Sequence, residues 1–498
     1  MSSSEINGGP IRMDSGVIRG STTGQDDSIS VYKGIPYAAP PVGELRWRPP
    51  APVEPWKGIR PATEFGPAAP QGFSNFGGIN EKVWQSEDCL FLNVWTPAKS
   101  PDERLPVMVW IHGGGFAIGS GSNPGYTGAN LCEKGVVIVT INYRLNIFGA
   151  FAHPLLTKES GHNASGNYGL MDQVAALKWV QRNIRSFGGN PDRVTIFGES
   201  AGSRSVTLLV ASPLSEGLFH GGICQSGATR DVSQSLEDRE KEGIRTAEAV
   251  GARTLDELRS RTFSDFDAFL AFNSNPVGAF NSNPMVDGRV IPDDPRSIYA
   301  EGKQHRVSLI IGSNADEGTL GLGNTRIKTT EDFKSFIGHR YNENADEVHS
   351  LYAPDTDESV YEALNRHQTD RNMTLHARKQ VRWMEKAGAK SYLYHFTRVP
   401  PTKVGQRLGS HHGAEIAYIF GNFGPGGDEL TEIDRKLSWA MMTYWTQFAA
   451  SGDPNYNRLP NWPAYRTEND AYLELGDDIK AGENLHKARL DVLDRLVK

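Results

Sequence analysis

Cysteine is scarce in this chain. Its 498 residues contain only Cys89, Cys132 and Cys224, and no two of these have a CxxC spacing. Three thiols cannot all pair with one another, and structural zinc sites usually show closely spaced cysteines. The sequence therefore excludes a disulfide-built scaffold and gives no sign of a structural metal site.

Long apolar runs are also missing. The longest ones, at residues 107–111 and 136–141, have the length of a strand and fall far short of the ~20 residues that a membrane-spanning helix needs. Residues 1–10 show neither the basic region nor the apolar core of a secretory signal. We expect a protein without a membrane anchor or a membrane partner, located in the cytoplasm.

An excess of positive charge is absent as well. The chain has 52 Lys and Arg against 59 Asp and Glu, a net charge of −7, whereas nucleic-acid binding depends on a positive field. One segment, residues 366–386, is locally basic, with six Lys or Arg residues and Trp383 as the one aromatic residue near them. We interpret this segment as a solvated helix face and expect no nucleic-acid partner.

The chain does contain alternating strand and helix signals. An apolar pattern of helical spacing runs from Leu170 to Ile184 and ends before Gly188. The strand signals, in chain order, are residues 16–19, 30–33, 91–95, 107–111, 136–142, 193–198, 220–225, 307–311 and 391–396. This order predicts an α/β fold, with a large, mostly parallel sheet and helices on both faces. Because no linker or composition break divides the chain, we expect residues 1–498 to form one domain with long insertions.

One pentapeptide, Gly198-Glu199-Ser200-Ala201-Gly202, matches the pattern G-x-S-x-G. A strand signal ends at Gly198 and a helix-compatible run follows at residues 205–211, which is the strand–turn–helix context of a nucleophile elbow. The two glycines leave room for the neighbouring strand and helix at so sharp a turn. We therefore predict that Ser200 is a nucleophile; an ordinary Gly-Ser turn is the alternative.

Three consecutive glycines follow another predicted strand, in the segment His112-Gly113-Gly114-Gly115-Phe116. Backbone N–H groups of such a loop, together with the N–H that follows the nucleophile, stabilise the oxyanion of an acyl-transfer intermediate. We predict an oxyanion hole formed by Gly114, Gly115 and Ala201. A merely flexible loop is the alternative, because residues 117–121 are also rich in glycine.

These two motifs belong to a longer series. The other members, in chain order, are residues 32–41, 45–50, 86–95, 142–144, 166–169, 189–191 and 225–227. In this order they resemble the type-B carboxylesterase and cholinesterase family, in particular its bacterial, p-nitrobenzyl-esterase-like members. The resemblance covers most of the chain and implies an α/β-hydrolase fold and a serine esterase, but it is much less specific for a substrate.

The resemblance also places an acid and a base downstream of the nucleophile. The family pattern puts the acid directly before a glycine that follows a predicted strand, which selects Glu317 and leaves Asp316 as a turn or capping residue. It puts the base before a small residue and three positions before a glutamate, which selects His412. His411 is left with a local packing or hydrogen-bonding role.

Such a triad would hydrolyse a carboxylic ester through an acyl-enzyme, with water as the final acceptor. This chemistry requires no metal and no organic cofactor, so we expect none. The expected partner is a small-molecule ester, and the expected state is a monomer or a weak homo-oligomer. The resemblance further suggests a polar cluster of Glu199, Ser226 and Glu415 behind the triad, although the three could equally be structural residues.

The chain departs from the family pattern in two places. In secreted relatives the cysteine equivalent to Cys89 pairs with an upstream cysteine, but residues 66–71 of this chain contain none, which implies a reducing compartment. Arg204 stands one helical turn beyond Ser200, where relatives usually carry small residues. The sequence leaves open whether its side chain reaches solvent or contacts a carboxylate.

Three functions fit this sequence to different degrees. The first is a carboxylesterase for small or medium esters. The second is a specialised hydrolase of carbamates, amides, aryl esters or a toxin ester, which would use the same triad. The third is a non-catalytic, cholinesterase-like interaction protein, but such proteins usually lose the nucleophile or the base, and this chain retains both.

Overall fold

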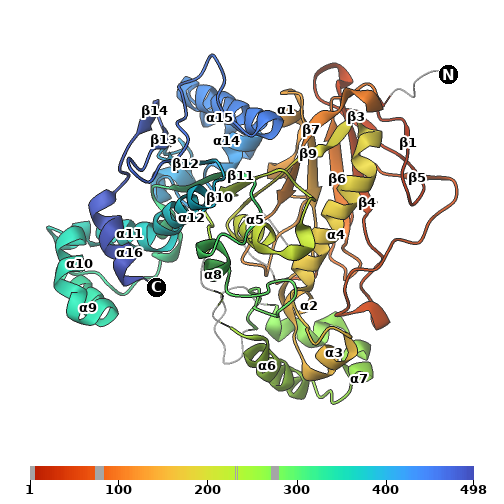
Figure 1. The fold of residues 1–498 in the computed structure, drawn as a ribbon, viewed down its shortest axis with the longest axis horizontal. Helices are drawn as coiled ribbons and strands as arrows, with labels where there is room; N and C mark the ends of the chain where they lie inside the picture. Colours follow the sequence, from red (N-terminus) through yellow and green to blue (C-terminus); the bar gives the residue numbers. More distant parts are fainter. Residues whose placement is uncertain (1–5, 73–82, 230–231, 233, 271–279, 498) are drawn as a thin grey trace.

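An eleven-stranded sheet forms the centre of the molecule (Figure 1). The computed structural model describes residues 6–72, 83–229, 232, 234–270 and 280–497. From one edge of the sheet to the other, the strands are β14 (Ile479–Gly482), β13 (Tyr472–Leu475), β12 (Ser391–Phe396), β11 (Ser308–Asn314), β10 (Gly221–Gln225), β9 (Gly189–Glu199), β7 (Leu105–Ile111), β8 (Val137–Ile141), β6 (Phe91–Thr96), β4 (Ile29–Pro36) and β3 (Ser21–Thr23).

The middle of this sheet is parallel and its edges are antiparallel. Neighbouring strands pair in parallel along the stretch β13-β12-β11-β10-β9-β7-β8. At the edges, β14, β6, β4 and β3 join the sheet in antiparallel pairs. The central strands β7 and β8 are buried almost throughout, which explains their continuous apolar sequences. A separate three-stranded sheet holds β1 (Pro10–Arg12), β2 (Val17–Arg19) and β5 (Ile59–Pro61).

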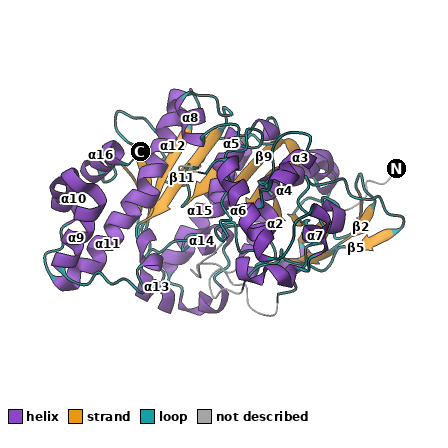
Figure 2. Ribbon diagram, turned by 90° about the horizontal axis from the view of Figure 1, so that it is seen from below, coloured by secondary structure: helices purple, strands orange, loops and turns teal. Residues whose placement is uncertain are grey.

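Helices cover both faces of the large sheet, because successive side chains of a strand point to opposite sides. In β7, Val107 and Val109 join one hydrophobic core and Met108 and Trp110 join another. The first core is closed by α4 (Tyr168–Asn183), α5 (Ala201–Ala211), α8 (Pro295–Ala300) and α12 (Leu375–Lys386). The second is closed by α1 (Ala129–Cys132), α14 (Ile416–Phe420) and α15 (Glu432–Ser451). Figure 2 shows β11 between α12 on one side and α15 on the other. The predicted fold class is therefore confirmed.

Two smaller hydrophobic cores lie under the insertions. One is built from α2 (Asn146–Ala150), α3 (Pro154–Glu159), α6 (Leu236–Ala249) and α7 (Leu255–Ser260). The other is built from α9 (Thr330–Tyr341), α10 (Ala345–Tyr352), α11 (Val360–Thr369) and α16 (Lys487–Leu496). A short helix, α13 (Lys403–Leu408), precedes α14. The inserted helices lie beside the main sheet (Figure 1) and bring hydrophobic cores of their own.

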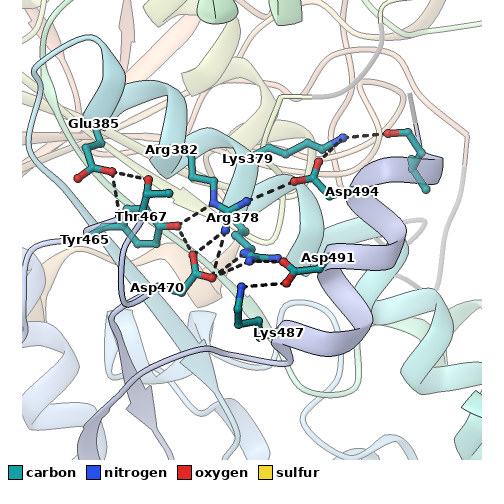
Figure 3. A network of polar contacts seen from close by, with 11 residues as sticks. Arg378, Lys379, Arg382, Glu385, Tyr465, Thr467, Asp470, Lys487, Asp491 and Asp494 are labelled. Carbon is teal, nitrogen blue, oxygen red and sulfur yellow. Dashed lines mark hydrogen bonds and ion pairs between the residues drawn. The ribbon is translucent and has the colours of Figure 1, made fainter. Parts of the chain in front are cut away.

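The basic segment at residues 366–386 is not simply a solvated face. It spans the end of α11, a π-helical turn at Asp370–Thr374 and α12. Arg378 is buried, and its Nη2 donates to Asp470 and Asp491 at 2.6 Å each (Figure 3). Arg382 also reaches Asp470, at 3.1 Å. The predicted solvated face is therefore wrong for Arg378, because carboxylates from distant parts of the chain neutralise its charge and allow it to be buried.

Two further predictions concern a disulfide bridge at Cys89 and a membrane-spanning helix. All three cysteines are buried and free, so the bridge found in secreted relatives is absent, as the residues before Cys89 predicted. Within the described residues, no helix combines the length and the apolar character that crossing a bilayer requires.

Candidate active site

Ser200 lies in the tight turn between β9 and α5. Its backbone angles are φ 55° and ψ −118°, a conformation that a residue with a side chain adopts only where its surroundings impose it. A Cβ atom at Gly202 would lie 1.9 Å from the carbonyl oxygen of Ile111, and one at Gly198 would lie 2.5 Å from the same oxygen. The absence of both side chains brings α5 against the end of β7, which is the geometry of a nucleophile elbow.

The glycine loop that follows β7 lies directly against this elbow. A Cβ atom at Gly113 would lie 3.2 Å from Cβ of Ser200. Gly114 and Gly115 have φ angles of 103° and 64°, and their N–H groups donate to no acceptor that lies within the described residues. The N–H of Ala201 is the first in α5, where a helix offers no acceptor of its own. Backbone donors from two segments are therefore available beside Ser200.

A stacked pair of rings holds the glycine loop in place. The imidazole of His112 lies 4.4 Å from the ring of Tyr143, nearly parallel to it. Tyr143 donates its hydroxyl to the His112 carbonyl oxygen at 2.8 Å, and His112 Nδ1 lies 2.8 Å from the Gly113 carbonyl oxygen. Burial lowers the pKa of His112 to about 4. The loop is thus fixed by a neutral imidazole, which adds no charge to the site.

The acid and the base come from two further loops. Glu317 begins a 3-10 turn, η8 (Glu317–Gly321), just after β11, and His412 lies between α13 and α14. His412 Nδ1 is 2.5 Å from Glu317 Oε2, and the backbone N–H of Asn314 donates to Glu317 Oε1 at 2.8 Å. Asp316 instead accepts the backbone N–H of Ser410 at 2.8 Å. Of the two neighbouring carboxylates, Glu317 is therefore the one that contacts the imidazole.

The two histidines of the pair face different partners. His411 Nδ1 lies 3.1 Å from the Gly409 carbonyl oxygen, so its ring is occupied locally. His412 Nε2 lies 3.1 Å from Oε1 of Glu199, the residue before Ser200. Among the described residues, the interactions of His412 include no hydrogen bond to the Ser200 hydroxyl. The imidazole is therefore held between two carboxylates, one on each ring nitrogen.

The charges of these groups depend on one another. Burial disfavours a charged His412, but the carboxylates of Glu199 and Glu317 outweigh burial and raise its pKa. Burial raises the pKa of Glu199, against the attraction of His412. Burial also opposes ionisation of Glu317, yet His412 and the Asn314 N–H lower its pKa. Glu317 thus stays ionised, while His412 and Glu199 compete for one proton and titrate as a pair.

The predicted polar cluster is only partly connected. Glu415 is buried and accepts hydrogen bonds from Gln225 Nε2 at 3.2 Å and from Asn314 Nδ2 at 2.6 Å. Ser226 follows β10 with a φ angle of 53°, and its buried hydroxyl has no hydrogen-bond partner within the described residues. Glu199 contacts His412 rather than either of them. The three residues surround the acid and the base without forming one hydrogen-bonded chain.

The structure shows contacts of two residues at the site. The sequence analysis did not identify Asn314, and it left the contacts of Arg204 open. Asn314, the last residue of β11, contacts Glu317, Glu415 and the backbone of His411. Its polarity at the end of an apolar strand was the available signal, but it does not specify a partner. Arg204 donates through Nη1 to Asn283 Oδ1 at 2.8 Å.

No group of three or more possible metal ligands occurs in the part of the chain that the structure describes.

Known proteins share this arrangement of sequence and fold. A family model described as "Carboxylesterase family" matches residues 9–493. The fumonisin B1 esterase of Sphingopyxis macrogoltabida is 36% identical over 480 residues, which cover 94% of this chain and 87% of the relative. The para-nitrobenzyl esterase of Bacillus subtilis (strain 168) is 34% identical over 476 residues, covering 93% and 94%. A solved PNB esterase structure superimposes with a TM-score of 0.82 at 33% identity, covering 98% of this chain and all of the other.

Proposed function

Because the chain belongs to the carboxylesterase family and is a carboxylic ester hydrolase, we propose that it cleaves esters with Ser200 as nucleophile, His412 as base and Glu317 as the partner of that base. The observation that carries this proposal is the convergence of four segments that are distant in the sequence. The elbow at Ser200 and the glycine loop lie against each other, and the 2.5 Å contact joins His412 to Glu317 beside Glu199.

The proposed reaction has two halves. In the first, His412 Nε2 takes the proton of the Ser200 hydroxyl while its oxygen attacks the ester carbonyl carbon. The tetrahedral intermediate collapses as the carbon–oxygen bond of the alcohol breaks, and His412 returns the proton to that alcohol. In the second half, water gives a proton to His412 and attacks the carbonyl carbon of the acyl-enzyme. The bond from that carbon to Ser200 Oγ then breaks, His412 returns the proton to Oγ, and the carboxylic acid is released. Glu317 stabilises the imidazolium in both halves.

The negative charge that develops on the carbonyl oxygen needs donors that are already in place. We propose the N–H groups of Gly114, Gly115 and Ala201, since none of them has an acceptor among the described residues and the glycine loop lies against the elbow. Preorganised donors of this kind lower the barrier because they need no rearrangement during the reaction. Removing one such donor usually costs about 3 kcal/mol of transition-state stabilisation.

Glu199 has a definite place in this proposal. His412 Nε2 faces Glu199 in the structure, so it has to turn from that carboxylate toward the Ser200 hydroxyl when the ester enters. Catalytic hydrogen bonds commonly tighten only in the substrate complex. The proton shared by His412 and Glu199 has to leave Nε2 before that nitrogen can accept another, and we therefore expect activity to depend on how this pair titrates.

The deciding experiment compares Ser200→Ala with the parent protein on p-nitrophenyl acetate and p-nitrophenyl butyrate. We expect turnover and a burst of p-nitrophenol in the parent, and neither in the variant. Full activity in the variant, or an inactive parent, would show that the proposed chemistry is wrong. His411→Ala and His412→Ala form a matched pair: both should fold, and activity should collapse only in the second.

A second candidate function differs only in the substrate. One relative is named a fumonisin B1 esterase and is 36% identical to this chain, which favours specialised hydrolysis of a toxin ester by the same triad. A panel of esters that vary in acyl and alcohol size, with fumonisin B1 as one member, tests it. A kcat/KM for fumonisin B1 far above that for simple esters would support specialisation, and the opposite order would support a general carboxylesterase.

We also infer that residues 1–498 form one domain. The elbow follows β9 and the acid follows β11, and both strands belong to the same large sheet. The smaller cores of the insertions add to this unit rather than replace it, because no part of the proposed triad lies within them.

A further inference from the structure

The contact between Glu317 and His412 joins residues that lie 95 positions apart. Both residues stand in loops, and loops are the least constrained parts of a fold. A positioning error of about 1 Å in a catalytic group can cost roughly 100-fold in rate. Two loops therefore have to be fixed relative to each other. We name the segment after β11 that carries Glu317 the acid loop, and the segment between α13 and α14 that carries His412 the base loop.

Two residues just before Glu317, Asn314 and Asp316, hold the base loop by its backbone. Asp316 Oδ2 accepts the Ser410 N–H at 2.8 Å, and the Asp316 N–H donates to the Ser410 carbonyl oxygen at 3.0 Å. Asn314 Nδ2 donates to the His411 carbonyl oxygen at 2.8 Å. These three hydrogen bonds, which we name the clasp, hold the three peptide groups that precede His412.

The clasp is itself held from behind. Asn365 Nδ2, on α11, donates to Asp316 Oδ1 at 2.7 Å, so both oxygens of this carboxylate are occupied. Ser410 is fully buried, and its hydroxyl donates to the Phe396 carbonyl oxygen at the end of β12 at 2.9 Å. Asn314 is fully buried as the last residue of β11. The base loop is thereby tied to two adjacent strands of the sheet and to one helix.

We propose that Asn314 and Asp316 are positioning residues that place His412 against Glu317 by holding the backbone of Ser410 and His411. The proposal rests on the triad proposed above and extends it. Neither side chain contacts the imidazole of His412, so each acts through the loop that carries it. Asp316, which the sequence suggested only as a turn or capping residue, has a task in the geometry of the site.

The test is a double-mutant cycle, since a cycle isolates the coupling between two positions. Asn314→Ala and Asp316→Ala are made in the parent and in a Glu317→Gln background, with p-nitrophenyl butyrate as substrate. If the clasp acts through the acid–base contact, each variant lowers kcat about 10- to 100-fold in the parent and less than about threefold in Glu317→Gln, in line with the cost of misplacing a catalytic group. KM should stay within about threefold in both backgrounds.

A pH profile adds a readout that a loss of stability would not move. The Glu317 carboxylate raises the pKa of His412, so a loosened contact should shift the acid limb of kcat/KM to lower pH in the clasp variants. Asn93→Ala is the matched control. It removes a buried asparagine that also makes two hydrogen bonds, to Gly34 and Thr140, within β6 and its neighbours. It should lower the melting temperature and leave kcat and the pH profile unchanged.

The two clasp variants also check each other. Asn314 donates to Glu415 as well as to the base loop, whereas Asp316 makes no contact with Glu415, and a loss confined to Asn314→Ala would overturn the clasp. Where the alanine variant of Asp316 does not fold, Asp316→Asn keeps the shape and one acceptor, and takes its place. Equal losses in both backgrounds, or no loss in either, would refute positioning while leaving the triad intact. If Ser200→Ala or Glu317→Gln alone leaves activity unchanged, the proposed function fails first.

Discussion

Replacing Glu317 by glutamine is the sharpest test of the acid, because the side chain keeps its shape and loses its charge. Glu317 accepts two hydrogen bonds, one at Oε1 from the Asn314 backbone N–H at 2.8 Å and one at Oε2 from His412 Nδ1 at 2.5 Å. An amide offers an acceptor on one side only and donors on the other. Glutamine therefore cannot satisfy both partners.

Either orientation of the amide carries a cost. If its oxygen stays on Asn314, its NH2 group faces His412 Nδ1 and favours the tautomer with the proton on Nε2, where it blocks proton uptake from Ser200. If the amide turns round, two donors oppose each other at a buried site, which costs about 1–3 kcal/mol. In both cases the imidazolium of the proposed mechanism loses the negative charge beside its Nδ1. We expect kcat to fall about 10³- to 10⁴-fold, which corresponds to ~4–5.5 kcal/mol.

Steady-state hydrolysis of p-nitrophenyl butyrate measures this loss, with thermal unfolding to verify the fold. Glu385→Gln is the matched control, since Glu385 also accepts a backbone N–H, from Thr467 at 2.9 Å, but lies in the network of α12 (Figure 3). Its kcat should equal that of the parent. A loss below tenfold in folded Glu317→Gln would refute the tautomer argument and the role of this acid.

Three further outcomes follow from the described contacts. Arg378→Ala should lower the free energy of unfolding by about 3 kcal/mol in urea titrations without changing the kcat of folded protein, because the buried Asp470 loses a charge partner; an unchanged midpoint would contradict this. Glu199→Gln should move the acid limb of kcat/KM to lower pH. The Glu199 carboxylate raises the pKa of His412. In the proposed mechanism a protonated His412 cannot act as the base, so a lower pKa lets activity appear at lower pH; a pH–rate profile with an unmoved or raised midpoint would oppose this. Gly202→Ala should yield little folded protein by circular dichroism, since its Cβ would lie 1.9 Å from β7, and a native spectrum would argue against the tight elbow.

Much of the sheet could be predicted from the sequence because its central strands are buried on both faces. Apolar runs marked β6, β7, β8, β10, β11 and β12 close to their observed bounds. The start of β9 was harder to predict. It lies at Gly189 rather than at residue 193, because Gly189 pairs with Leu105 before a register shift in the β7–β9 ladder. Pairing with a distant strand decides such a boundary, and no local pattern contains it.

Charged residues were harder to assign than apolar ones. Arg378 was expected in solvent, yet it is buried by Asp470 and Asp491, which lie 92 and 113 positions away. A helical pattern shows that two charges share a face, but it cannot show that a later segment will neutralise them. The same limit applies to Asn314, because two of its three partners, His411 and Glu415, lie about 100 positions further along the chain.

The candidate site was easier to predict from the sequence, because its motifs encode backbone geometry. Gly198 and Gly202 require a close approach to β7, and the structure contains that approach. The selection of Glu317 and His412 came from a family pattern, and the structure brings these two side chains into contact. Their catalytic roles stay predictions until the variants are measured. Hydrogen bonds from Asp316 to the base loop had no signal in the sequence, since a turn residue can direct its carboxylate to many partners.

The edges of the large sheet have a consequence for the behaviour of the protein at high concentration. An exposed strand edge can recruit the edge of another molecule and start aggregation. Here one edge is β3, which is only three residues long, and the other is β14, with four residues. In β14 the solvent-exposed Lys480 makes an ion pair with Glu474 on the neighbouring strand. Short edge strands, one of them marked by a lysine, offer a poor template for edge-to-edge growth, so the size of this sheet does not by itself make it prone to polymerise.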